Sequence, residues 1–180
     1  MDAAEKTLAS RLVYDGRVLR LRVDTVALPD GREALREVAE HPGGVAVVAI
    51  DGEGRVLTVK QYRYVFSRVL EELPAGKLER GEDPRAAALR ELKEETGATP
   101  ARFTALGELI VSPGAYGEVL HLYLAEELTF GAPSPDEDEY LELVRTPLDE
   151  LARRALSGEL TDAKTVAGIL KVYALRRLGR

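Results

Sequence analysis

The sequence predicts a mixed α/β chain, and three local patterns carry this prediction. Residues 84–96 read as a capped helix, and residues 45–50 are a continuous apolar run typical of a buried strand. Residues 12–26 alternate apolar and polar side chains around an Asp-Gly turn, as a β-hairpin does. With 180 residues, the chain is long enough to bury a sizeable core.

The helix at residues 84–96 is predicted from its two ends. Asp83 suits the N-cap, Pro84 suits the first helical position, and Gly97 is the expected left-handed stop. The apolar stripe expected to face the core is Ala88, Leu89 and Leu92.

The opposite face of this helix carries Glu91, Glu94 and Glu95, whose spacing brings three carboxylates over one turn. Arg90 stands four residues before Glu94 and is placed to hold that carboxylate. Glu91 and Glu95 then form an oxygen-rich patch that suits Mg²⁺, which binds through carboxylates, water and substrate phosphates. From the glutamates alone, the alternative is an ordinary solvated helix face.

The longer stretch at residues 76–98, GKLERGEDPRAAALRELKEETGA, decides between these interpretations. Its glycines, glutamates and arginine resemble the Nudix box at every fixed position, over 23 residues. The resemblance implies a Nudix α/β/α sandwich with a mixed sheet, preceded by an N-terminal antiparallel sheet. It also implies metal-dependent hydrolysis of a nucleoside diphosphate linked to another group.

The same resemblance assigns roles to individual residues of the box. The implied metal ligands are Glu91 and Glu95 at the centre, Glu82 as an outer ligand, and Ala75 through its backbone carbonyl. Arg90 would position the glutamates, and Glu94 would be a further ligand or would orient the attacking water. The implied cofactor is Mg²⁺, with Mn²⁺ or Zn²⁺ as substitutes.

Sequence outside the box resembles the ADP-ribose pyrophosphatase branch of the family. The segment Glu72-Leu73-Pro74-Ala75-Gly76 is typical of that branch. A proline about 16 residues past Gly97, here Pro113, is also typical of it. The resemblance implies hydrolysis of ADP-ribose to AMP and ribose 5-phosphate. The alternatives are a nucleotide sugar, FAD or a dinucleoside polyphosphate as substrate, or a nucleotide-sensing domain without catalysis.

In that branch, the N-terminal strands pair across a homodimer and help to build the adenosine pocket. Residues 1–41 are therefore expected to form this element, and residues 42–180 the catalytic domain. By position, Arg36 and Glu37 would contact adenine. Arg63 would grip a phosphate, or would instead pair with an acidic neighbour. Tyr116 would stack on a base or ribose and Glu118 would reach substrate or metal, unless both belong to a plain surface loop.

The acidic run at residues 135–139 falls where the branch carries a mobile catalytic loop. By resemblance, Glu137 would be the base that activates water, with Glu94 as the other candidate, and Glu139 would complete a metal site. Upstream of the box, either Glu71 or Glu72 is expected to face the site, because strand alternation sends them to opposite faces.

The remaining elements follow from periodicity and turn residues. Strands are expected at residues 34–40, 56–64, 69–74, 103–111, 119–125 and 140–145. Helices are expected at residues 147–156, with Thr146 as cap, and 161–178. Residues 1–10 read as a loose or marginally helical start, and residues 112–118 as a loop too long for a minimal hairpin.

Composition bounds the compartment and the partners. A net charge of −6 argues against a nucleic-acid-binding surface, and the absence of cysteine excludes disulfides and thiolate metal sites. No apolar run approaches a membrane span and no signal-peptide pattern stands at the start, so a cytoplasmic protein is expected. The lack of Asn and Cys and the single Gln favour a thermophilic source, although GC-rich coding gives the same skew.

Overall fold

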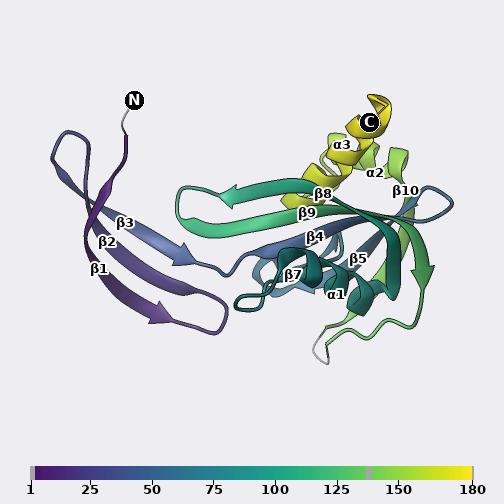
Figure 1. Ribbon diagram of the computed structural model, residues 1–180, viewed down its shortest axis with the longest axis horizontal. Helices are drawn as coiled ribbons and strands as arrows, with labels where there is room; N and C mark the ends of the chain where they lie inside the picture. Colours follow the sequence, from purple (N-terminus) through teal and green to yellow (C-terminus); the bar gives the residue numbers. More distant parts are fainter. Residues whose placement is uncertain (1–2, 137–138, 180) are drawn as a thin grey trace. The chain divides into compact units, whose positions relative to one another are not determined.

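We describe a computed structural model of residues 3–136 and 139–179 (Figure 1). The strands are β1 Lys6–Asp15, β2 Arg20–Ala27, β3 Glu33–Glu40, β4 Gly44–Ile50, β5 Arg55–Arg63, β6 Arg68–Glu72, β7 Ala75–Lys77, β8 Ala98–Ser112, β9 Tyr116–Phe130 and β10 Leu141–Pro147. The helices are the 3₁₀ turn η1 Tyr64–Phe66, α1 Pro84–Thr96, α2 Leu148–Leu156 and α3 Ala163–Arg177. The predicted mixed α/β class is confirmed.

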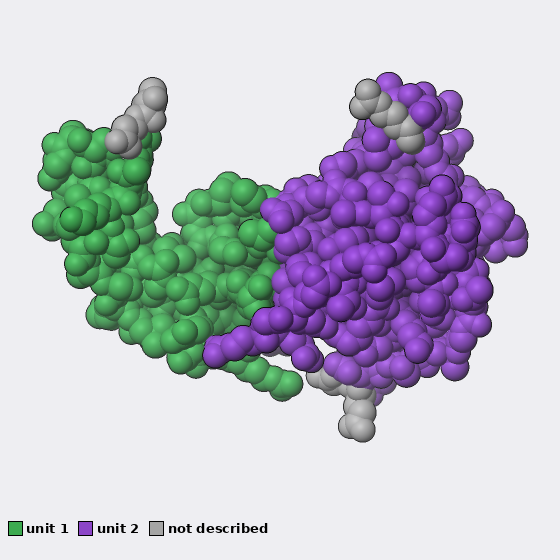
Figure 2. Space-filling view, in the orientation of Figure 1, with its two compact units in different colours: residues 1–43, 110–119 green, residues 44–109, 120–180 purple. Residues whose placement is uncertain are grey.

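The chain divides into two compact units, residues 1–43 with 110–119, and residues 44–109 with 120–180 (Figure 2). In the first unit, β1, β2 and β3 form an antiparallel sheet, and Ala39 of β3 pairs with Tyr116 at the start of β9. The expectation of a loose start through residue 10 is wrong, because Lys6 already pairs with Ala27 in the β1–β2 ladder.

The second unit is built on a mixed sheet in the order β9–β4–β5–β10. β4 runs parallel to β9 and antiparallel to β5, and β10 runs antiparallel to β5. β6 pairs with β5, and β7 pairs with β4. Every residue of β4 is buried, as its uniformly apolar sequence predicts.

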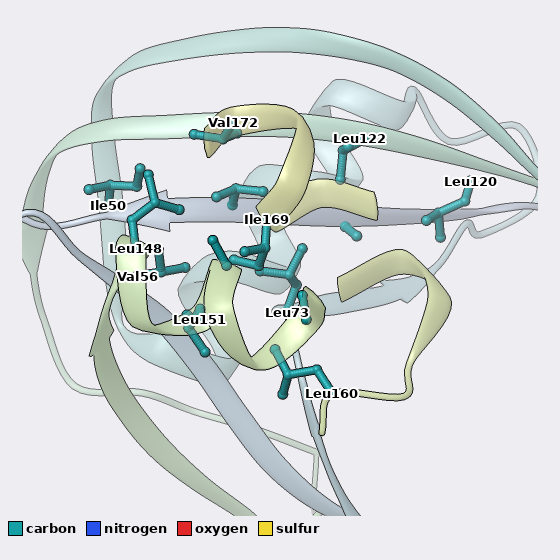
Figure 3. Close-up of a cluster of buried hydrophobic side chains, with 14 residues drawn as sticks. Ile50, Val56, Leu73, Leu120, Leu122, Leu148, Leu151, Leu160, Ile169 and Val172 are labelled. Carbon is teal, nitrogen blue, oxygen red and sulfur yellow. The ribbon is translucent and has the colours of Figure 1, made fainter. Parts of the chain in front are cut away.

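Side chains of β4 alternate between two apolar layers. Val48 and Ile50 pack in one cluster with residues of α2 and α3, which Figure 3 shows around Leu151 and Ile169. Val47 packs in the other cluster with Ala87, Ala88 and Leu92 of α1. Helices therefore cover both faces of this sheet, and the expected α/β/α sandwich is confirmed.

Helix α1 begins and ends at the predicted residues. The side chain of Asp83 accepts a hydrogen bond from the backbone N–H of Ala86 at 2.9 Å, and Pro84 is the first helical residue. Gly97 ends the helix with a φ of 71°, a backbone conformation that residues with a side chain rarely adopt. Ala87 joins the buried face, while Leu89 is only partly buried.

Two local expectations are wrong. β8 extends to Ser112 and β9 begins at Tyr116, so a three-residue loop replaces the longer one expected between them. Thr146 does not cap α2, because it is a buried residue of β10 and Pro147 occupies the N-cap without a side-chain bond. No helix within the described ranges is long and apolar enough to cross a membrane.

Candidate active site

The guanidinium group of Arg90 bonds to three carboxylates in and just before α1. Arg90 donates from Nη1 to Glu91 at 2.8 Å and to Glu94 at 3.0 Å. It also donates from Nε and Nη2 to the two carboxylate oxygens of Glu82, at 3.0 and 3.1 Å. These bonds, led by those to Glu82, raise the pKa of Arg90, and the bond from Arg90 lowers the pKa of Glu82. The contact expected between Arg90 and Glu94 is present.

Glu95 is the most deeply buried carboxylate of the group. Its side chain accepts a hydrogen bond from the backbone N–H of Ala75 at 3.1 Å, and the residue is 6% exposed. Burial raises the pKa of Glu95 to about 8, and the negative charges of Glu91 and Glu139 act in the same direction. Burial likewise raises the pKa of Glu91, although the charge of Arg90 opposes it.

Gly76 lies directly against the Glu91 carboxylate. A Cβ added to Gly76 would come within 2.0 Å of the Glu91 carboxyl carbon and one of its oxygens. Any side chain at position 76 would therefore displace the Glu91 carboxylate from its place beside the β7 backbone. This contact brings the short strand β7 and helix α1 together around Glu91.

The same neighbourhood extends to the segment before β10. After burial, the charge of Glu139 is among the causes that raise the pKa of Glu91 and of Glu95. Glu137, the predicted base, lies outside the described residues. Among the residues that the structure describes, no three His, Asp or Glu side chains are arranged as a ready-made metal site.

The chemistry of the donors nevertheless fits a hard divalent cation. Glu91, Glu95 and Glu139 offer only oxygen, and two of these carboxylates are held where burial opposes their charge. Within the described ranges, Glu95 forms no ion pair with a Lys or Arg side chain. A bound cation would supply positive charge to offset these buried carboxylates.

Arg63 pairs with an acidic neighbour, one of the two predictions made for it. It donates from Nε and Nη2 to the two oxygens of Glu72, at 2.6 and 2.8 Å. Lys164 of α3 donates to the same carboxylate. Burial acts to raise the pKa of Glu72, but the bond from Arg63 and the charge of Lys164 outweigh it, and the pKa is lowered. The neighbouring Glu71 turns to Thr58 and Arg154 instead.

Sequence reasoning missed Lys164. It stands in the first turn of α3, two residues after the cap Asp162, where a lysine is unremarkable on any helix. Its partner Glu72 is 92 residues away in sequence. The pair Glu71 and Glu72 before the box predicted that one of the two faces the site, but it gave no sign of a partner on α3.

The other predicted substrate-binding residues belong to the first compact unit. Arg36 forms an ion pair with Glu5 at 2.5 Å, and its neighbour Glu37 is exposed on the opposite face of β3. Tyr116 and Glu118 both approach the buried His41. The Tyr116 and His41 ring centroids are 5.3 Å apart, and a Glu118 oxygen lies 3.7 Å from His41 Nδ1. Burial, then the charge of Glu118, raises the pKa of Tyr116.

The raised pKa of Glu95 predicts the pH dependence of stability in the metal-free protein. Between its ordinary value of 4.5 and about 8, the folded chain holds a proton that the unfolded chain has lost. The free energy of unfolding therefore falls as pH rises through this window. The variant E95Q keeps an acceptor for Ala75, so we expect it to be more stable than wild type above pH 8, by on the order of 1–3 kcal/mol.

Urea unfolding in EDTA across this pH range measures the difference between the two proteins. It should shrink toward zero below pH 4.5, where both side chains are neutral. The exposed Glu150 of α2 provides the matched control, E150Q, for which no such trend is expected. A difference between E95Q and wild type that is independent of pH would contradict the assignment.

Two family descriptions match the chain in succession. Residues 5–39 match the "Nucleoside diphosphate sugar hydrolase N-terminal domain", and residues 40–168 match the "NUDIX domain". The crystal structure of an ADP compounds hydrolase has the same fold, with a TM-score of 0.84 at 23% identity over 98% of this chain and 96% of that one.

Two bacterial relatives are similar over nearly their whole length. A Bacillus subtilis protein named ADP-ribose pyrophosphatase is 43% identical, over 92% of this chain and 90% of its own. A Bacillus methanolicus protein named methanol dehydrogenase activator is also 43% identical over the same shares. With the box carboxylates gathered on α1 and the domain match over residues 40–168, the chain belongs to the Nudix hydrolase family.

Proposed function

We propose that this protein hydrolyses the pyrophosphate link of ADP-ribose, giving AMP and ribose 5-phosphate. The observation that carries the proposal is the carboxylate cluster of α1, in which Arg90 joins Glu82, Glu91 and Glu94 beside the buried Glu95. The 43% identity to a protein named ADP-ribose pyrophosphatase supports the choice of substrate.

We infer that a divalent cation, Mg²⁺, is bound by this cluster, with Mn²⁺ or Zn²⁺ as substitutes. The residues proposed to hold it are Glu91 and Glu95, the backbone carbonyl of Ala75, and Glu82 and Glu139 at the periphery. When bound, the cation neutralises phosphate charge and lowers the pKa of a coordinated water. The buried, oxygen-only donor set supports this inference.

The side chains of the chain itself divide the remaining tasks. Arg90 orients the glutamates through four charge-assisted bonds, two to Glu82 and one each to Glu91 and Glu94. We propose that the proton of the attacking water passes to Glu137 or to Glu94, whose side chain is 37% exposed. Arg63 is half-exposed beside Glu72, and we propose that it attracts the diphosphate of the substrate.

The alternative substrates are other nucleoside diphosphate derivatives: a nucleotide sugar, FAD or a dinucleoside polyphosphate. The match of residues 5–39 to a nucleoside diphosphate sugar hydrolase domain favours the nucleotide sugars among them. A nucleotide-sensing role without hydrolysis is a further alternative, against which the complete set of box glutamates argues.

Purified protein with Mg²⁺ and ADP-ribose should yield AMP and ribose 5-phosphate, identified by chromatography. The variants E91Q and E95Q should each lower kcat by about 10²-fold or more, because each removes a proposed ligand charge. E150Q, on the exposed face of α2, should keep wild-type activity. Comparing kcat/KM across the alternative substrates tests the choice of ADP-ribose, and a higher value for any of them would replace it.

A substitution at Gly76 tests the proposed cation site without removing a carboxylate. In G76A the new methyl group would overlap the Glu91 carboxylate, so that this flexible group must move. We expect the affinity for Mn²⁺, measured by calorimetry, to fall about tenfold or more with little change in stability. The control G52A adds a methyl group to a glycine with open space around it. Equal Mn²⁺ affinity in the two variants would exclude Glu91 as a ligand.

We further propose that residues 1–41 form a dimerisation and adenosine-binding element and that residues 42–180 form the catalytic domain. Large apolar side chains stand exposed on the first compact unit and support a homodimer: Leu8, Leu12, Tyr14, Leu35 and Ile110. A cytoplasmic location and a thermophilic source stay predictions.

The dimer proposal predicts that a charge at Leu35, which is 65% exposed on β3, weakens association. In L35D, size-exclusion chromatography with light scattering should show the mass of a monomer, because burying a carboxylate in an apolar interface is unfavourable. L156D, at a 74% exposed leucine of α2, serves as the control and should remain dimeric. A wild-type protein that is monomeric would refute the proposal directly.

A further inference from the structure

The N-terminus of α3 is bonded to the chain segment that leads into the box. Asp162 caps the helix by accepting from the backbone N–H of Thr165 at 3.0 Å and from its hydroxyl at 2.6 Å. The Thr165 oxygen in turn accepts a hydrogen bond from the backbone N–H of Leu73 at 2.8 Å. Thr165 is fully buried, so this link is shielded from water.

From Leu73 the bonding continues to the carboxylates of α1. The carbonyl of Pro74 accepts from the N–H of Val47 in β4 at 2.9 Å, and the N–H of Ala75 donates to Glu95. The first turn of α3 therefore helps to fix the backbone against which Glu95 is held. Apart from Glu95, the residues that make these contacts lie outside the box.

Lys164 adds charge to this arrangement. Its ammonium group lies between Glu72, with which it shares a hydrogen bond, and Asp162 at 3.1 Å. The same oxygen of Glu72, Oε2, also accepts from Nη2 of Arg63. One buried carboxylate oxygen thus bonds to two cations, and Lys164 has a second acidic partner in Asp162.

The two cations differ in exposure. The side chain of Lys164 is 15% exposed, whereas that of Arg63 is 41% exposed. The bond to Glu72 is the main cause that raises the pKa of Arg63, and the charge of Glu95 adds to it. The charge of Lys164 opposes the effect of burial on the pKa of Glu95. Arg63 is therefore the cation at the accessible end of this network.

We propose that Lys164 is a positioning residue for the diphosphate of the substrate. By bonding to the same Glu72 oxygen, it weakens the hold of this carboxylate on Arg63, so that the half-exposed guanidinium is fixed in place and can still bond to a phosphate oxygen. The inference rests on the proposed function, since it assigns the source of substrate affinity in the same site. It adds a residue from the C-terminal helix, far from the box in sequence.

The variant K164M removes the charge while keeping an unbranched side chain of similar length. With Glu72 then bonded to Arg63 alone, the KM for ADP-ribose should rise about tenfold, with kcat changed less than about threefold. K164R, which restores the charge, should recover most of the affinity. K171M is the matched control, because Lys171 lies on the same helix and bonds to the Leu106 carbonyl on the surface.

A second variant separates this role from a structural one. In K164M/E72Q the carboxylate that would neutralise Arg63 is also gone, so the KM should return to within about threefold of wild type. A purely structural role for Lys164 predicts the opposite, because the double variant loses more bonds than K164M does. A KM that stays raised in K164M/E72Q would therefore overturn the proposal.

A binding measurement without turnover completes the test. In EDTA, inorganic pyrophosphate should raise the melting temperature of wild type and K171M more than that of K164M. If K164M matches K171M both in this shift and in KM, the proposal is wrong even though ADP-ribose is hydrolysed. If the pyrophosphate effect is present but wild type does not hydrolyse ADP-ribose, the proposed function fails and the role of Lys164 in diphosphate binding stands.

Discussion

The arrangement of the site depends on how the chain keeps several carboxylates together on one helix. Like charges at this spacing repel each other, and burial of Glu91 and Glu95 adds to the cost of ionising them. Arg90 offsets part of this repulsion through its bonds to Glu82, Glu91 and Glu94. Among the described residues, the Glu95 side chain accepts a hydrogen bond from the backbone N–H of Ala75, so a cation would still offset charge in this cluster.

The fold of the second unit holds these carboxylates in place on α1. β4 is buried on both faces, and its alternate side chains anchor α1 on one side and α2 with α3 on the other. The backbone just before the box joins these layers, because Leu73 bonds to Thr165 of α3 and Ala75 bonds to Glu95 of α1. The carboxylates of α1 are thus positioned by contacts that reach both helical layers, which suits a site that must hold its geometry.

Local signals predicted what depends on neighbouring residues. Asp83, Pro84 and Gly97 defined α1, and the spacing of Arg90 and Glu94 predicted their ion pair. Contacts between residues that are distant in sequence were not predicted. The early start of β1 depends on pairing with β2, and the bond of Lys164 to Glu72 spans 92 residues. A resemblance suggested roles for Arg63 and Glu139 that stay predictions, and the sharing of Glu72 by Arg63 and Lys164 appears only in the structure.

Two glycines of the box are constrained for different reasons, and this bears on how the family can vary. At Gly76 the obstacle is the end of the Glu91 side chain, which a shorter acid at position 91 would relieve. At Gly97 the obstacle is the backbone oxygen of Gly131, 2.2 Å from an added Cβ, and φ is positive as well. Position 76 can therefore change in concert with a second site, whereas at position 97 both the backbone contact and the positive φ disfavour a side chain, and no side-chain change elsewhere alters that φ.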